Sequence, residues 1–227
     1  MFFDLGGTLL VMRRDRIFQR VISENGRDAS LGSIHSAYMS LEPWWLETYS
    51  VRQMSPEEAV ESYRHLDEKM FSSLFPDASR DEAVRTSGLV RKRWPELAKE
   101  IPLELYPDVE PTLVSLSERG IHLGLISNAT ADTARTVDQL GLGKYMSNIV
   151  ISGLVGYTKP NPEIFRIALR NAGATSSESI HVGDIYEADV VGARNAGMKG
   201  ILIDREGGAE RHDCPTLSDL RQVLDHV

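Results

Sequence analysis

The sequence predicts an α/β protein whose doubly wound parallel sheet is interrupted, after its first strand, by an all-helical insert. From about residue 105 onward, short apolar runs alternate with amphipathic segments, as strands and crossover helices do. Between residues 13 and 102, long amphipathic stretches follow one another with almost no strand-like run. We therefore expect a discontinuous, Rossmann-like core of residues 1–12 and 103–227 and a helical domain of residues 13–102.

The expected strands are apolar runs that are rich in Ile, Leu and Val. After the insert they comprise residues 121–127, 148–153, 179–184 and 199–204. Continuous apolar runs of this length are typical of strands that are covered on both faces of a parallel sheet. The first strand has only Met1, Phe2 and Phe3 before Asp4, whereas strands usually run to about five or six residues. Either the start of the chain is truncated or this strand is naturally abbreviated.

The expected helices carry recognisable start and stop signals. In the core they cover residues 108–120 and 129–141, which end in glycine, and residues 161–173, which begin with Asn161 as N-cap and Pro162 at the first helical position. In the insert we expect helices over residues 14–25, 32–49, 55–75 and 79–99, with breaks at Gly26, residues 55–56, residues 75–77 and Pro95.

The composition excludes some classes of function. The chain has 227 residues, a formal net charge of -8 and a pI near 5.3, whereas nucleic-acid and anionic-membrane surfaces need clustered Lys and Arg. No apolar run approaches the roughly 20 residues that a membrane span needs, so we expect a cytoplasmic protein with neither kind of partner. The single cysteine, Cys214, is interpreted as an incidental thiol. The oligomeric state is left open.

Polar side chains follow the expected strands at the points where these end. They are Asp4, then Ser127 and Asn128, then Lys159 in the loop before residues 161–173, and Asp184. Ligands of open α/β sheets bind beyond the carboxyl ends of the strands, so these side chains should share one edge of the sheet. Taken singly, each is also what a turn or helix cap would contain. The ordered set D-x-x-G-T, S-N, K-P and G-D-x-x-x-x-D is much more specific than its parts.

This ordered set resembles the haloacid dehalogenase-like hydrolase superfamily, and the insert falls where that family's small cap domain enters. By resemblance, Asp4 would be the nucleophile that attacks a phosphoryl group and forms an aspartyl-phosphate. Thr8, Ser127 and the backbone N–H of Asn128 would bind the phosphoryl oxygens. Lys159 would neutralise both the nucleophile and the transferring group, because phosphoryl transfer depends on positioning and positive charge.

The resemblance also implies a Mg²⁺ site. Asp4, the backbone carbonyl of Gly6 and Asp184 would bind the ion, since Mg²⁺ prefers carboxylates, carbonyls, waters and phosphate oxygens. Asp189 would lie outside this set, supporting a metal-bound water or Lys159. It could equally be the N-cap of the following helix. A small phosphorylated metabolite is the substrate class that this site implies.

Gly6 departs from the family pattern. In the family's phosphatases this position holds a second aspartate, which protonates the leaving oxygen and later activates water, and a glycine can do neither. The favoured hypothesis is a Mg²⁺-dependent phosphohydrolase that is slow or limited by its leaving group. The alternatives are a catalytically impaired protein that binds phosphate ligands or regulates, and a 2-haloacid dehalogenase. The dehalogenase ranks last, because a metal-free site would have little reason to collect Asp184, Glu187 and Asp189.

Some features carry no assigned role. Two adjacent tryptophans, Trp44 and Trp45, cannot both face one core at helical spacing, so one of them could line a substrate gap, although packing is the favoured interpretation. Arg52 is expected to be a solvated side chain. His122 and His181 fall in strand-like runs and are interpreted as core or edge residues, because no two histidines have metal-ligand spacing on one element.

Overall fold

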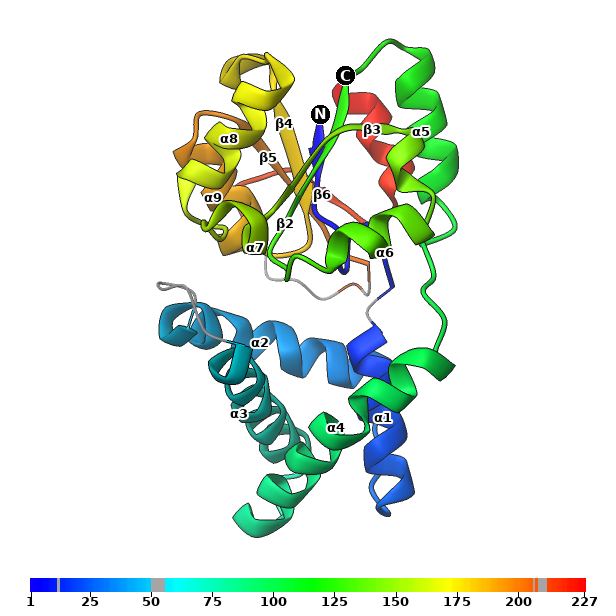
Figure 1. Ribbon diagram of the computed structural model, residues 1–227, viewed down its shortest axis with the longest axis vertical. Coiled ribbons are helices and arrows are strands. Elements are labelled where there is room, and N and C mark those ends of the chain that lie inside the picture. The colour runs from blue at the N-terminus through cyan, green and yellow to red at the C-terminus, as the bar shows by residue number, and fades with distance from the viewer. Residues whose placement is uncertain (12, 50–55, 206, 208–211) are drawn as a thin grey trace. The chain divides into compact units, whose positions relative to one another are not determined.

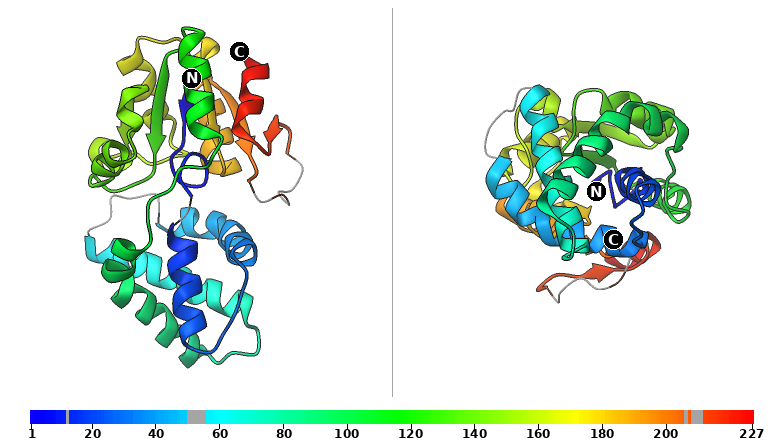
Figure 2. Two further views of the ribbon diagram at one scale, coloured as in Figure 1. Left: turned by 90° about the vertical axis from the view of Figure 1, so that its right-hand side faces the viewer. Right: turned by 90° about the horizontal axis from the view of Figure 1, so that it is seen from below.

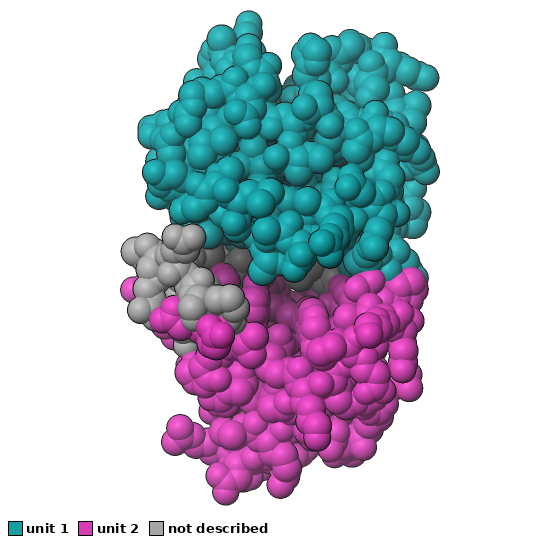
Figure 3. Space-filling view, viewed as in Figure 1, with its two compact units in different colours: residues 1–11, 103–227 teal, residues 12–102 magenta. Residues whose placement is uncertain are grey.

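The structure is a computed structural model that describes residues 1–11, 13–49, 56–205, 207 and 212–227. It divides into two compact units, which Figure 3 colours separately. The sheet unit consists of Met1–Val11 and Leu103–Val227, and the helical unit consists of Met12–Pro102. Figures 1 and 2 show the two units as ribbons.

The sheet unit contains a six-stranded, wholly parallel sheet, in the order β3-β2-β1-β4-β5-β6 within the described residues. The strands are β1 (Phe2–Phe3), β2 (Leu123–Ser127), β3 (Met146–Ile151), β4 (Ile180–Gly183), β5 (Lys199–Ile203) and β6 (Thr216–Leu217). The predicted α/β fold class is confirmed. The sixth strand was not predicted, because its two residues show no apolar run and only their pairing with β5 makes them a strand.

Helices cover both faces of this sheet (Figures 1 and 2). On one face, α5 (Val109–Glu118), α6 (Thr133–Gln139) and η4 (Leu220–His226) bury residues such as Leu113, Val137 and Val223 in one apolar cluster. On the other face, α8 (Pro162–Ala172) and α9 (Gly192–Asn195) bury Phe165 and Ala193. Shorter elements connect them: η1 (Leu142–Lys144), α7 (Ser152–Val155), η2 (Ser176–Glu178) and η3 (Tyr186–Val191). An apolar cluster on each face of the sheet therefore supports the strands whose ends carry the polar residues.

The short strand β1 occupies the middle of the sheet. Phe2 pairs with Gly124 of β2 on one side and with His181 of β4 on the other. A Cβ on Gly124 would lie 2.7 Å from the Phe2 ring, so glycine at this position lets the strands pack. The chain leaves β1 toward β2 and β3 on one side and returns to β4 on the other. The carboxyl ends of β1 and β4 therefore lie at the topological switch point, where such sheets bind ligands.

The helical unit contains α1 (Arg13–Glu24), α2 (Leu31–Tyr49), α3 (Pro56–Leu74) and α4 (Arg80–Glu100) among its described residues. Each lies within two residues of an expected helix. The break expected at Pro95 is wrong, since Pro95 lies inside α4. Val90 and Leu97, on either side of it, are buried in the same apolar cluster. This packing holds the helix together across the hydrogen bond that proline cannot donate.

The favoured interpretation of Trp44 and Trp45 of α2 as packing residues agrees with the structure, but the expectation that they cannot both face one core is wrong. Trp44 and Trp45 both pack, partly buried, against the apolar cluster of the helical unit. Trp45 stacks on Tyr63 with ring centroids 5.4 Å apart, and the Lys69 Nζ lies 4.4 Å from the Trp44 ring centroid. Neighbouring helical positions point about 100° apart, and α2 contacts both α1 and α3, so each ring finds a neighbour. Arg52 lies outside the described residues.

Candidate active site

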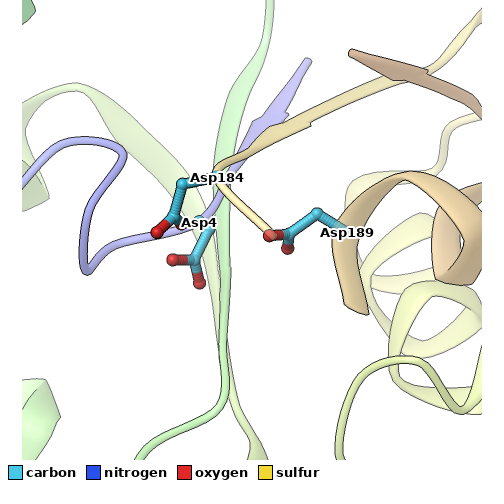
Figure 4. A group of neighbouring side chains, drawn as sticks. All are labelled: Asp4, Asp184 and Asp189. Atoms are coloured by element: carbon cyan, nitrogen blue, oxygen red, sulfur yellow. The ribbon is translucent and has the colours of Figure 1, made fainter. Parts of the chain in front are cut away.

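The strand ends bring the expected polar residues to one edge of the sheet. Asp4 directly follows β1, Ser127 is the last residue of β2, and Asp184 directly follows β4. The Asp4 backbone N–H donates to the Val182 carbonyl at 2.9 Å, which aligns the end of β1 beside the end of β4. Carboxylate oxygens of Asp4, Asp184 and Asp189 lie within 4.8 Å of one another, and Figure 4 shows the three side chains. All three are buried.

Lys159 joins two of these carboxylates. Its Nζ donates to Asp4 Oδ1 at 2.5 Å and to Asp189 Oδ1 at 2.6 Å, and the lysine is only 2% exposed. Hydrogen bonds between ionised partners are the strong ones, and burial strengthens them further. Lys159 therefore lies between the candidate nucleophile Asp4 and the residue that was expected outside the metal ligands, Asp189.

The charges of this cluster do not balance. Three carboxylates and one ammonium leave a net charge of -2 when all are ionised. Burial, together with the charges of Asp4 and Asp189, raises the pKa of Asp184 well above its usual range. Burial also raises the pKa of Asp4 to about 6, although Lys159 opposes this shift. A divalent cation between Asp4 and Asp184 would neutralise the cluster, and two carboxylates are the hard oxygen ligands that such an ion prefers.

A glycine makes room for Asp184. Gly7 has a φ of +75°, in the left-handed region, and a Cβ added to it would lie 2.0 Å from Asp184 Oδ2. Asp184 Oδ1 accepts a hydrogen bond of 3.1 Å from the hydroxyl of Thr8, which is fully buried. The turn after β1 therefore provides both the space for Asp184 and a hydrogen-bond donor to it.

Gly7→Ala is expected to displace Asp184 as well as to strain the turn. A left-handed conformation costs a residue with a Cβ about 1–2 kcal/mol, and the clash with Asp184 adds to this cost. The matched control is Gly120→Ala, because Gly120 has a φ of +73° and a Cβ there would meet nothing within 4 Å. Urea unfolding should give a clearly larger loss of free energy for Gly7→Ala. Equal losses would mean that the close approach to Asp184 does not constrain position 7.

Two further predicted residues, Ser127 and Asn128, lie at the carboxyl end of β2, which pairs with β1. Asn128 accepts a 2.7 Å hydrogen bond from the Lys159 N–H at Oδ1, and its Nδ2 donates to the Lys159 carbonyl at 2.9 Å. The Asn128 side chain is therefore used to hold the backbone of Lys159. Only the backbone N–H of Asn128 remains for the expected contact with phosphate. Ser127 is 5% exposed at the end of β2. Gly6 lies half-buried in the turn after Asp4 and has no side chain to add a proton donor.

Sequence reasoning missed two residues that contact this cluster or its turn. His181 is completely buried, which agrees with its interpretation as a core residue. Its Nε2 lies 2.9 Å from Asp189 Oδ1, a contact that was not predicted. Arg205 donates from Nη2 to the Thr8 carbonyl and from Nη1 to Asp108 Oδ2, each at 2.5 Å. His181 stands two residues before the G-D pair of the ordered set, which was a usable signal that it lies near the site but not of its partner. Nothing in the sequence marks Arg205, because its partners lie far away along the chain.

Comparison with protein families agrees with this geometry. A family model described as haloacid dehalogenase-like hydrolase matches residues 36–203, which is more than half of the chain. The chain belongs to this family. The matched range of the haloacid dehalogenase-like hydrolases includes Ser127, Lys159, Asp184 and Asp189 and begins after Asp4.

The chain is also similar in sequence to individual proteins. The chain is 37% identical over 146 residues to the phosphoserine phosphatase of Thermus thermophilus, covering 62% of this chain and 58% of the relative. It is 38% identical over 132 residues to the glyceraldehyde 3-phosphate phosphatase of Methanothermobacter thermautotrophicus, covering 54% and 58%. It is 30% identical over 199 residues to haloacid dehalogenase-like hydrolase domain-containing protein 3 of Danio rerio, covering 77% and 81%. The matches to the two phosphatases thus span less than two thirds of those proteins.

Solved structures share the fold. A putative hydrolase of the family from Bacillus subtilis, bound to magnesium, superposes with a TM-score of 0.69 at 15% identity, covering 99% of this chain and 96% of that one. A 2-haloacid dehalogenase from Pseudomonas syringae gives a TM-score of 0.58 at 24% identity, covering 99% and 95%. At these identities the likeness concerns the fold alone. Among the described helices, none has the length and hydropathy needed to cross a bilayer.

Proposed function

We propose that this chain is a Mg²⁺-dependent phosphohydrolase that acts on a small phosphorylated substrate through an aspartyl-phosphate at Asp4. The observation that carries the proposal is the buried contact of 2.5 Å between Lys159 Nζ and Asp4 Oδ1, with Asp184 in the same acidic group. The names of the two phosphatase relatives, which refer to phosphoserine and glyceraldehyde 3-phosphate, support this substrate class. Residues 13–102 would then form the cap domain and the sheet unit the catalytic core.

Asp4 is suited to be the nucleophile. It directly follows the central strand β1 at the switch point of the sheet, is 7% exposed, and accepts a hydrogen bond from Lys159. In the proposed reaction, an Asp4 oxygen forms a bond to phosphorus while the bond from phosphorus to the leaving oxygen breaks. Water then attacks the phosphorus of the aspartyl-phosphate and releases inorganic phosphate. The ammonium of Lys159 stabilises negative charge in both steps.

Mg²⁺ fits the acidic group. Its proposed ligands are Asp4, Asp184 and the backbone carbonyl of Gly6, and the net charge of -2 of the four side chains matches one divalent cation. When bound, the ion would supply positive charge beside the phosphoryl oxygens. Asp189 is the least suited to be a ligand, because its Oδ1 already accepts from Lys159 and its Oδ2 accepts from the Ile185 N–H at 3.0 Å. Ser127 and the Asn128 N–H would bind the remaining oxygens, whereas the Thr8 hydroxyl, which was also expected to bind them, already donates to Asp184 Oδ1.

Gly6 sets the expected limits of this activity. General acid–base assistance is typically worth about 10²–10⁴-fold in rate, and a glycine offers none. Alkyl phosphates, whose alkoxides leave poorly, should react slowest, and acyl or aryl phosphates should react fastest. The hydrolysis of the aspartyl-phosphate should also be slow, since no carboxylate at position 6 can take a proton from water.

A screen of phosphate esters and acyl phosphates, in Mg²⁺ and in EDTA, tests the proposal. We expect slow release of phosphate from acetyl phosphate and p-nitrophenyl phosphate in Mg²⁺ and its loss in EDTA. Absence of any release across a broad panel, or release that EDTA does not reduce, would contradict the proposed activity.

The glycine also favours a second candidate, a protein that binds phosphate ligands without turnover. Such a protein would be stabilised against thermal unfolding by phosphorylated metabolites with Mg²⁺, and these ligands would remain intact. Dehalogenase activity is not proposed, because a metal-free site would have little reason to gather the buried carboxylates of Asp4, Asp184 and Asp189 into one group.

A further inference from the structure

His181 is buried beside the acidic cluster, and the proposed reaction leaves it without a role. It lies on β4, pairs with Phe2 of β1 and Gly200 of β5, and is completely buried. Phe165 of α8 meets its ring edge-to-face, with centroids 5.1 Å apart and planes at 83°. Burying an imidazole in this layer costs free energy unless the ring makes a hydrogen bond. A specific polar partner should therefore accompany it.

That partner is Asp189. His181 Nε2 lies 2.9 Å from Asp189 Oδ1, and an ionised carboxylate can only accept, so the imidazole donates from Nε2. Among the described residues, Nδ1 is buried without a hydrogen-bond partner. A bare ring nitrogen tolerates this better than a buried N–H would. Burial also lowers the pKa of His181, which agrees with a neutral ring that carries its proton on Nε2.

Both carboxylate oxygens of Asp189 accept hydrogen bonds. Oδ1 accepts from both His181 and Lys159, and Oδ2 accepts from the Ile185 backbone N–H. A Cβ on Gly183 would lie 2.0 Å from Asp189 Cγ, so only a glycine at position 183 leaves space for the Asp189 carboxylate beside β4. Lys159 and His181 hold the pKa of Asp189 well below its usual range against the effect of burial. Asp189 is thus an ionised, oriented carboxylate.

We propose that His181 is a positioning residue for phosphoryl transfer, because it fixes the Asp189 carboxylate that holds the Lys159 ammonium against Asp4. A continuous set of hydrogen bonds runs from His181 through Asp189 and Lys159 to Asp4, with lengths of 2.9, 2.6 and 2.5 Å. This role rests on the proposed function. Without the imidazole N–H, Asp189 Oδ1 would accept a side-chain hydrogen bond from Lys159 alone. The side chains of Asp189 and Lys159 could then turn together away from Asp4.

Two substitutions separate positioning from packing. His181→Gln keeps an N–H donor at about the reach of Nε2, and His181→Leu keeps apolar bulk without a donor. We expect His181→Leu to lower kcat on acetyl phosphate by about 10–100-fold, as losses of orienting partners do, with little change in KM. His181→Gln should retain kcat within a few-fold. His122→Leu, an exposed histidine, is the control for histidine loss and should match the native chain.

A readout that does not depend on turnover completes the test. ¹H–¹⁵N spectra at neutral pH should show His181 protonated at Nε2 only, and a slowly exchanging Lys159 ammonium, assigned by its loss in Lys159→Met. The ammonium signal should persist in His181→Gln and disappear in His181→Leu. A proton on Nδ1, an ammonium signal unchanged in His181→Leu, or equal loss of kcat in both variants would overturn the positioning role. If the native chain releases no phosphate but the spectra agree, the proposed function fails and the hydrogen-bonded arrangement stands.

Discussion

Gly6→Asp is expected to raise kcat for an alkyl phosphate by about 10²–10⁴-fold, or roughly 3–5 kcal/mol of barrier. The new carboxyl group would stand two residues after Asp4, in the turn that follows β1. There it could protonate the leaving alkoxide and then accept a proton from the attacking water. The measurement is steady-state release of phosphate from an alkyl phosphate in Mg²⁺ by the native chain and the variant.

The control is Gly6→Asn, which has nearly the same size but no acid. It should show no gain, so a gain shared by both variants would mean that a better-ordered turn, and not proton transfer, is responsible. The leaving group supplies a second control, because p-nitrophenolate leaves readily without a proton. The gain with p-nitrophenyl phosphate should therefore be far smaller than with the alkyl ester. No gain with either substrate would contradict the assignment of position 6.

Asp4→Asn is expected to reduce phosphate release by about 10⁴-fold or more, as the loss of a nucleophile does in other hydrolases. An amide oxygen cannot form the aspartyl-phosphate, and the ion pair with Lys159 is lost. The effect should appear with every substrate, including those with good leaving groups, which distinguishes it from the effect of position 6. Residual activity near that of the native chain would exclude Asp4 as nucleophile.

The same variant is expected to fold. Burial raises the pKa of Asp4 to about 6, above its ordinary value of 3.8, so the ionised group lowers the stability of the native chain at pH 7. The neutral amide avoids this cost, and in EDTA the variant should unfold at an equal or higher temperature at pH 7. The difference should shrink as the pH falls through 6 and vanish below about 4, where the Asp4 carboxyl is protonated in both states. Thermal unfolding across this pH range measures it.

The sequence predicted the fold well because its signals are local. A terminal glycine such as Gly120 and a capping residue such as Asn161 act on residues close to them in the chain, and the helices that they delimit, α5 and α8, form where expected. The helix expected over residues 129–141 is shorter, at Thr133–Gln139. The sixth strand and the continuity of α4 through Pro95 were missed. In both cases tertiary contacts decide the outcome: pairing with β5 for the strand, and burial of Val90 and Leu97 for the helix.

The site shows the same division. Asp4 and Asp184 could be found because each directly follows a strand, and Lys159 could be found because it forms the K-P pair in the loop before α8. His181 and Arg205 could not be assigned partners, because Asp189 and the Thr8 carbonyl become their neighbours only after folding. The two interpretations of Asp189 could not be separated from the sequence either. Its contacts with Lys159 and His181 favour a supporting position over a helix cap.

Mass spectrometry of the acid-quenched protein tests the central claim most directly. The native chain would be mixed with acetyl phosphate and Mg²⁺, quenched, and digested, and the peptide that contains residue 4 would be analysed. Because Gly6 cannot activate water, an aspartyl-phosphate should accumulate on Asp4, in Mg²⁺ but not in EDTA, and should be absent from Asp4→Asn. A phosphoryl group on another residue, or none on any residue while Mg²⁺-dependent phosphate release continues, would contradict the account.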